Sequence, residues 1–165
     1  MGYKHTADVT KIGITNEVKL AVNASFTRAI LHDYDYDGHT LTVRLVDPKV
    51  QGAIYETYLT TGDKINKLLA CEPVRLFCKI IELRKIEIAL ATDEKIYALV
   101  IHKPEVEQFY SIDIDALRNM NENEVHYMGE KWIQEFIDKI DTKERRQQFI
   151  DGYVVSTDKV MSDRQ

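Results

Sequence analysis

The chain has 165 residues, of which 44% are hydrophobic and 30% are charged, the balance of a globular protein. This composition excludes wholesale disorder, and no apolar run reaches the roughly 20 residues that a membrane-spanning helix requires. The formal net charge is −5 and its acidic excess lies in residues 104–165, which argues against a protein that binds phosphate groups generally.

The length suits one domain, residues 1–165, with a β-rich part over 1–103, a helical part over 104–152 and a flexible tail over 156–165. The N-terminal residues lack the apolar segment of a secretory signal, so we expect a cytoplasmic protein. An N-myristoylation motif is partly matched, but no basic cluster follows to strengthen membrane binding. We therefore expect no membrane partner.

The first expected element is a short hairpin over residues 9–23. Its turn falls at Asn16 and Glu17. Apolar residues then alternate with others along the second arm, at Val18, Leu20 and Val22. Such alternation is typical of a half-buried strand.

The most strongly marked element is a second hairpin over residues 25–47. Its turn is Asp37-Gly38, a dipeptide that strongly favours the tight turns of β-hairpins. Apolar residues alternate along the following arm, at Leu41, Val43 and Leu45. The arm before the turn becomes polar, which indicates a tip that projects beyond the core.

Further strands are expected over residues 53–60, 74–83, 85–92 and 95–102, with a short helix between the first two. Thr61 or Asp63 would cap this helix, and Pro73 would stop it. The total is about seven strands. The sequence thus predicts an α+β fold, an antiparallel β-barrel-like or strongly twisted sheet with C-terminal helices.

The chain becomes helical in pattern after Pro104. The clearest helix covers about 129–140, where Trp132 belongs to an apolar stripe with helical spacing. An uncertain connection precedes it at residues 119–124. Asp141-Thr142 then caps a last helix that ends near Gly152.

The hairpin tip resembles part of a calcium-binding loop. Asp33, Asp35, Asp37 and Gly38 match the start of an EF-hand loop, but Arg44 stands where its bidentate glutamate belongs. We therefore predict no metal site and no cofactor. Neither a nucleophile with a partnered base nor a metal-binding histidine motif is present, so an enzyme is not the favoured interpretation. A metal-dependent hydrolase that uses these aspartates and His39 together with Asp113 and Asp115 remains a further alternative.

Basic and aromatic residues in the predicted strand 74–83 suggest another function. Cations that follow phosphates, interleaved with a ring that stacks on a base, are typical of single-stranded nucleic-acid binding by OB-like modules. The candidate face comprises Arg28, Arg44, Arg75, Phe77, Lys79, Arg84 and Lys85. If the C-terminal helices cover this strand instead, Phe77 belongs to the core.

The favoured interpretation is a non-enzymatic protein that binds another protein, of the kind found as accessory or inhibitor proteins of phages and mobile elements. Tyrosine provides contact area at low entropic cost and is common at interfaces. The expected contact residues form the acidic, tyrosine-bearing tip and are supported by the acidic helical end. They are Asp33, Tyr34, Asp35, Tyr36 and Asp37.

Overall fold

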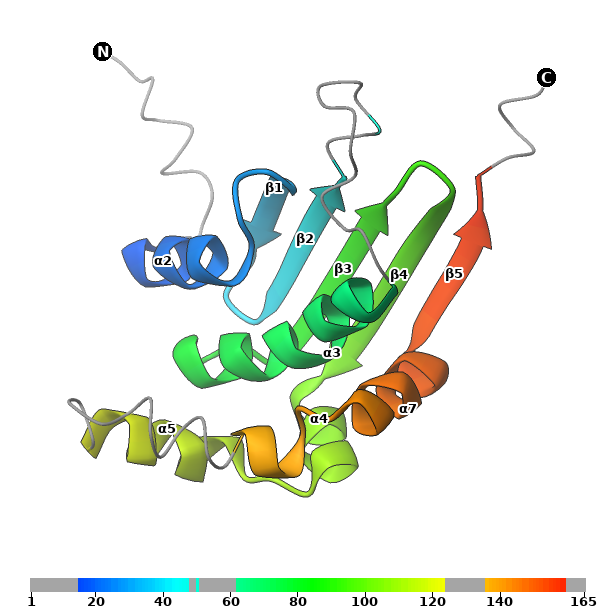
Figure 1. The fold of residues 1–165 in the computed structure, drawn as a ribbon. Coiled ribbons are helices and arrows are strands. Elements are labelled where there is room, and N and C mark those ends of the chain that lie inside the picture. Colours follow the sequence, from blue (N-terminus) through cyan, green and yellow to red (C-terminus); the bar gives the residue numbers. More distant parts are fainter. Residues whose placement is uncertain (1–14, 48–49, 51–61, 124–135, 160–165) are drawn as a thin grey trace, which may run out of the picture.

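The computed structural model describes residues 15–47, 50, 62–123 and 136–159 of the chain. Within these residues the protein is an α+β fold with one five-stranded mixed sheet (Figure 1). The elements in chain order are α2 (Asn16–Ser25), β1 (Leu31–Tyr36), β2 (Thr40–Val46), α3 (Gly62–Lys79), β3 (Lys85–Ala91), β4 (Lys95–His102), α4 (Lys103–Tyr110), α5 (Ile114–Asn123), α7 (Lys143–Tyr153) and β5 (Val154–Asp158).

The strands follow one another in space as they do in the chain, β1-β2-β3-β4-β5. All neighbouring pairs are antiparallel except β2 and β3, which run parallel. A parallel pair needs a long crossover connection, and α3 lies within this one. The expected barrel-like sheet of about seven strands is not confirmed: among the described residues the sheet has five strands and is not closed, with β1 and β5 at its edges.

Helices cover one face of the sheet, which we call the inner face. Figure 1 shows α2, α3 and α7 in front of the strands. Inward-facing residues from neighbouring strands lie side by side in register, for example Val43, Ile88 and Leu99. Each of these three is at most 2% exposed, so the main core lies between the inner face and the helices.

The predicted hairpin at Asp37-Gly38 is confirmed as β1 and β2. The predicted strands over 85–92 and 95–102 are confirmed as β3 and β4, which pair antiparallel. These elements could be predicted because strand alternation and turn chemistry are both local signals.

The predicted first hairpin is wrong where the structure describes it. Residues Asn16–Ser25 form helix α2, and the Thr15 side chain caps it by accepting a hydrogen bond from the Val18 backbone N–H at 3.3 Å. Val18, Ala21 and Val22 have helical spacing and are buried, whereas Leu20 is 72% exposed. The alternation seen in the sequence was therefore coincidental.

The predicted strand 74–83 is also wrong, because the short helix expected before it continues through Pro73 as α3. Proline removes one backbone donor, yet the helix persists because packing holds it. Val74, Leu76 and Phe77 are each 0% exposed, so α3 is buried on most of its circumference. Among the described helices, none is long and apolar enough to cross a membrane.

The C-terminal helical part is confirmed with two corrections. Residues 119–123 continue α5 and do not form a connection. Residues 154–158 form strand β5, where a flexible tail was expected from 156 onward. The Thr142 cap is confirmed, since its hydroxyl accepts the Arg145 N–H at 3.1 Å. Trp132 and the predicted strand 53–60 lie outside the described residues.

Candidate functional site

The hairpin turn between β1 and β2 is tightly fixed. Gly38 has φ +105°, a conformation that side-chain-bearing residues rarely adopt. The Asp37 carboxylate accepts hydrogen bonds from the backbone N–H groups of His39 at 2.9 Å and Thr40 at 2.8 Å. These two hydrogen bonds lower the pKa of Asp37. The Tyr36 hydroxyl also holds the turn, because it donates a hydrogen bond to the Gly38 carbonyl at 2.8 Å. The turn is thus a rigid support.

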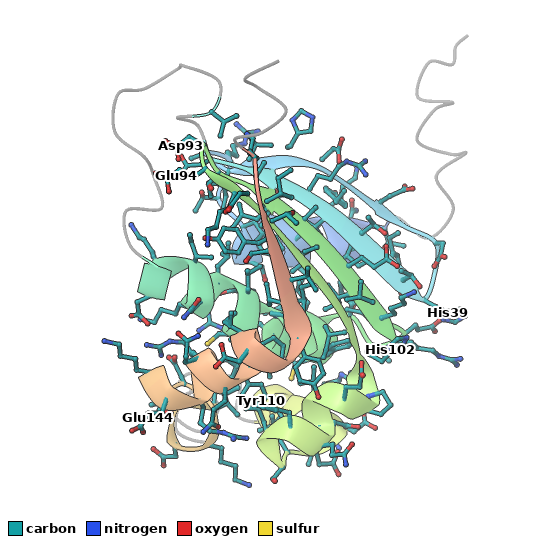
Figure 2. The ribbon with its side chains drawn as sticks, turned by 90° about the vertical axis from the view of Figure 1, so that its right-hand side faces the viewer. His39, Asp93, Glu94, His102, Tyr110 and Glu144 are labelled. Carbon is teal, nitrogen blue, oxygen red and sulfur yellow. The ribbon has the colours of Figure 1, made fainter. Side chains whose placement is uncertain are left out.

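Two other chain segments meet this turn. The His39 carbonyl accepts the N–H groups of Arg84 at 2.8 Å and Lys85 at 3.1 Å, at the start of β3. The Arg84 carbonyl in turn accepts the Lys103 N–H at 2.9 Å, at the start of α4. Figure 2 shows His39 and His102 at this end of the sheet, with Asp93 and Glu94 at the opposite end.

A cleft of about 930 Å³ opens where these segments meet, and we call it the turn-end cleft. Its walls carry basic, acidic and apolar side chains together. They come from His39, from the segment between α3 and β3, and from α4 and α5. The lining residues are His39, Ile81, Glu82, Leu83, Arg84, His102, Lys103, Pro104, Glu105, Asp115 and Arg118.

Several charges of the turn-end cleft are held by structural contacts. Arg118 donates to the Cys78 and Phe77 carbonyls at 2.9 and 2.8 Å, and thereby binds α5 to the C-terminal end of α3. Asp115 pairs with Lys103 at 3.1 Å and Arg118 at 2.6 Å, and these hydrogen bonds lower the pKa of the Asp115 carboxyl.

His102 is held at the start of α4. Its backbone N–H donates to the Glu105 carboxylate at 2.8 Å, and its ring Nδ1 lies 3.0 Å from the same oxygen. These contacts form a capping box and lower the pKa of Glu105. By contrast, Arg84 and Glu82 are exposed, and neither forms a side-chain ion pair with another described residue.

A second hollow, of about 350 Å³, lies on the other side of Ile81 and Glu82, which line both hollows. It is bordered by the N-terminal end of α2 and by Tyr36 and Gly38 of the hairpin. Ile81 is 55% exposed. The two hollows share Ile81 and Glu82, so an exposed apolar side chain lies at their common border.

The five tip residues predicted to bind a partner do not form one surface. Tyr36 is 6% exposed and packs in the core, so the expectation of two exposed tyrosines is wrong for it, and burial raises its pKa. Tyr34 is half-buried against the same core. Asp33 forms an ion pair with Arg44 at 2.5 Å, and Asp35 is exposed.

The predicted nucleic-acid face is not assembled. Phe77 is 0% exposed and cannot stack on a base. It lies in helix α3, where a strand was expected. Arg75 pairs with Glu72 at 3.4 Å and lies over the Phe136 ring. The other members are distributed over several elements: Arg28 follows α2, Arg44 lies on β2, Lys79 ends α3, Arg84 lines the turn-end cleft, and Lys85 pairs with Glu87.

The predicted set of acidic residues for a two-metal centre is dispersed as well. Asp113 caps α5 by accepting the Ala116 N–H at 3.1 Å, and Asp115 is held by its two cationic partners. Within the described part of the chain, no group of three or more His, Cys, Asp or Glu side chains is arranged to hold a metal ion.

The sequence did not reveal the turn-end cleft. Ile81, Pro104 and Arg118 come from three segments that meet only through the pairing of β2 with β3 and the packing of α5 on α3. Comparison of the chain with models of protein families, with curated proteins and with solved structures finds no match.

Proposed function

We propose that the protein is a non-enzymatic binding protein that holds a segment of a protein partner in the turn-end cleft and the adjoining hollow. The observation that carries this proposal is the pair of hollows that share Ile81 and Glu82. Because the two hollows share a border, one peptide segment can place neighbouring side chains in both. The hairpin turn beside them contributes a rigid wall, in place of the projecting tip expected from the sequence.

The chemistry of the walls defines the segment that would fit. An apolar side chain of the partner would pack on Ile81 and Pro104. Arg84 would attract an acidic neighbour of that side chain, and Glu82 a basic one. An ion pair at the edge of an interface adds specificity more than affinity, so most binding energy would come from the apolar contact.

The proposal can be tested with purified full-length protein and a displayed library of random peptides. A selected peptide carrying a fluorescent label is titrated against wild type, Ile81→Asp and Leu20→Asp. Leu20 is the matched control, because it is also an exposed apolar residue but lines neither hollow. Loss of a central apolar contact of about 2 kcal/mol weakens binding roughly 30-fold.

We expect this weakening in Ile81→Asp and unchanged binding in Leu20→Asp. Both side chains are exposed, so both variants should melt like the wild type. A peptide that binds Ile81→Asp as tightly as wild type would contradict the proposal. So would sub-micromolar binding of a single-stranded oligonucleotide that disappears in Arg84→Glu, since that result would favour the nucleic-acid alternative.

A further inference from the structure

Strand β5 forms one edge of the sheet, and only β4 pairs with it among the described strands. Figure 1 shows β5 at the side of the sheet away from β1. Figure 2 looks onto that side, and there β5 lies in front of the other strands. No described element therefore covers the side of β5 that faces away from β4, which we call the free side.

The hydrogen bonds between β4 and β5 show which backbone groups point to the free side. The Lys159 N–H donates to the Glu94 carbonyl at 2.9 Å, and an antiparallel pair exchanges hydrogen bonds at every second residue. In the observed register, Val155 and Thr157 thus direct their N–H and C=O groups to β4. The residues between and beside them direct theirs to the free side.

The free side offers both donors and acceptors. Ser156 and Asp158 each present one N–H and one C=O group there. Val154 presents its C=O alone, because its N–H donates to the Ile150 carbonyl at the end of α7. An edge that offers such groups is a template on which another strand can pair.

The two edges of the sheet differ in protection. β1 carries an irregularity between Leu31 and Asp33 and several ionisable side chains, which keep an edge strand from pairing with other chains. β5 continues its register without a break, is β-branched at three of five positions and has one charged residue, at its end. Lysines also protect edges, but the Lys159 Nζ donates to the Thr92 carbonyl at 3.0 Å, within its own chain. The edge at β5 is thus the one suited to pairing.

A second copy of β5 matches these groups when it lies antiparallel and the pair is centred on Ser156. The two Ser156 N–H groups then donate to each other's C=O groups, and each Asp158 N–H meets the Val154 C=O of the other copy. Every N–H group on the two free sides has an acceptor. Val155 lies opposite Thr157 of the other copy at a non-hydrogen-bonded position, where β-branched side chains pack closely.

Charge and shape also favour this arrangement. The two Asp158 residues lie at opposite ends of the strand pair, about 13 Å apart along it, which exceeds the Debye length of about 8 Å at physiological salt. A pair centred on Asp158 would place two carboxylates side by side, and one centred on Thr157 would set Val155 against Lys159. Helix α7 leads into the start of β5 (Figure 1), so the two copies of α7 lie at opposite ends of the pair.

We propose that the protein forms a homodimer in which the β5 strands of two copies pair antiparallel about Ser156. The two five-stranded sheets then join into one continuous sheet across a two-fold axis, the commonest symmetry of homo-oligomers. The contact consists of one short strand from each copy, so we expect a weak, concentration-dependent dimer. The turn-end cleft is lined by other elements, so this inference is independent of the proposed function.

Sedimentation equilibrium of the full chain, from about 1 to about 300 µM, tests the proposal. We expect the mean wild-type mass to rise with concentration towards twice the 19.1 kDa of one chain. Ser156→Pro removes the central N–H but leaves the ladder with β4 intact, because a free-side N–H is where an edge strand tolerates proline. It should raise the dimer dissociation constant by about tenfold or more, because both central hydrogen bonds are lost. Ser156→Ala is the matched control and should leave the constant unchanged, because it keeps the N–H.

Cysteine cross-linking is the second measurement, and it decides the question if Ser156→Pro fails to fold. Val155→Cys and Thr157→Cys are mixed in a buffer of reduced and oxidised glutathione. The native Cys71 and Cys78 are buried. Opposite positions can form a disulfide, whereas two copies of residue 155 are diagonal neighbours roughly 7–8 Å apart. We expect the mixture to give about tenfold more cross-linked dimer than Val155→Cys alone or than a mixture of Val155→Cys with the exposed control Leu20→Cys.

Three results would overturn the proposal. The first is a wild type that stays at the monomer mass over the whole concentration range. The second is a dimer that persists unchanged in folded Ser156→Pro, because another surface would then form it. The third is cross-linking of the mixture no greater than that of its controls, because residues 155 and 157 of two copies would then not lie opposite each other.

Discussion

Replacing Phe77 by alanine tests the position of α3 most directly. The Phe77 side chain is 0% exposed in the core. An aromatic side chain buries about 150–250 Å², which at about 25 cal/mol per Å² corresponds to roughly 4–6 kcal/mol. An alanine side chain still buries a small part of this area. The expected loss in the free energy of unfolding therefore agrees with the ~3–5 kcal/mol measured for Phe→Ala changes in protein cores.

The expected effect is large enough to measure by thermal or urea unfolding. In proteins of 150–250 residues each kcal/mol lowers the melting temperature by about 2–4 °C, so a loss of ~3–5 kcal/mol in Phe77→Ala should lower it by roughly 6–20 °C. Lys79→Ala is the matched control, because Lys79 lies on the same helix but is exposed, and its effect should stay within ~0.5 kcal/mol. If Phe77→Ala melts like the wild type, Phe77 does not face the core. The nucleic-acid hypothesis, which requires an exposed Phe77, would then regain support.

Three further predictions concern the turn, the thiols and the contact between α3 and α5. Asp37→Ala should destabilise the protein above the ordinary carboxyl pKa of 3.8, and the difference from wild type should shrink as the pH falls further, because the folded state lowers the pKa of Asp37. Burial raises the pKa of both Cys71 and Cys78 to about 12, so neither thiol should react with a thiol-specific reagent at pH 8 until the protein unfolds. Arg118→Ala should cost ~1–3 kcal/mol in urea unfolding, because it leaves two carbonyls of α3 without their donor.

Each of these predictions has a result that would contradict it. A constant difference between wild type and Asp37→Ala down to pH 2 would show that the carboxylate charge does not stabilise the turn. Rapid labelling of Cys71 in native protein would place it at the surface. Arg118→Lys is the control for Arg118→Ala: a lysine keeps the charge but only one donor group, so it should recover part of the loss, and equal stability of all three proteins would show that the contact is unimportant.

Local signals in the sequence located the elements whose structure depends on local chemistry. The Asp37-Gly38 dipeptide located the β1–β2 hairpin, and the cap at Thr142 marked the start of α7. The alternating arms of β3 and β4 were also identified, because each has one buried and one exposed face.

Tertiary packing determines the structure of the elements that were wrongly predicted from the sequence. The residues from Val74 to Ile80 are largely apolar, so they satisfy both a strand and a buried-helix pattern, and periodicity alone cannot separate them. β5 is short and mostly exposed, and it is held by pairing with β4 and by Lys159, whose N–H donates to the Glu94 carbonyl at 2.9 Å. These contacts are long-range and leave no local signal.

The candidate site was even less accessible to sequence analysis. His39 and Arg84 were visible as polar residues near strand ends, but their proximity follows from the parallel pairing of β2 with β3. Ile81 was expected on a strand face; it lies instead in the segment after α3, where its side chain is exposed.

The proposed function depends most on the partner segment occupying the turn-end cleft. Hydrogen exchange measured by mass spectrometry, with and without a saturating selected peptide, maps the contact on the whole chain. We predict slower exchange in residues 37–40, 80–85 and 103–106, which meet at the cleft, and unchanged exchange in β4 and β5. Protection confined to β4 and β5, with none at the hairpin turn, would contradict the proposed site.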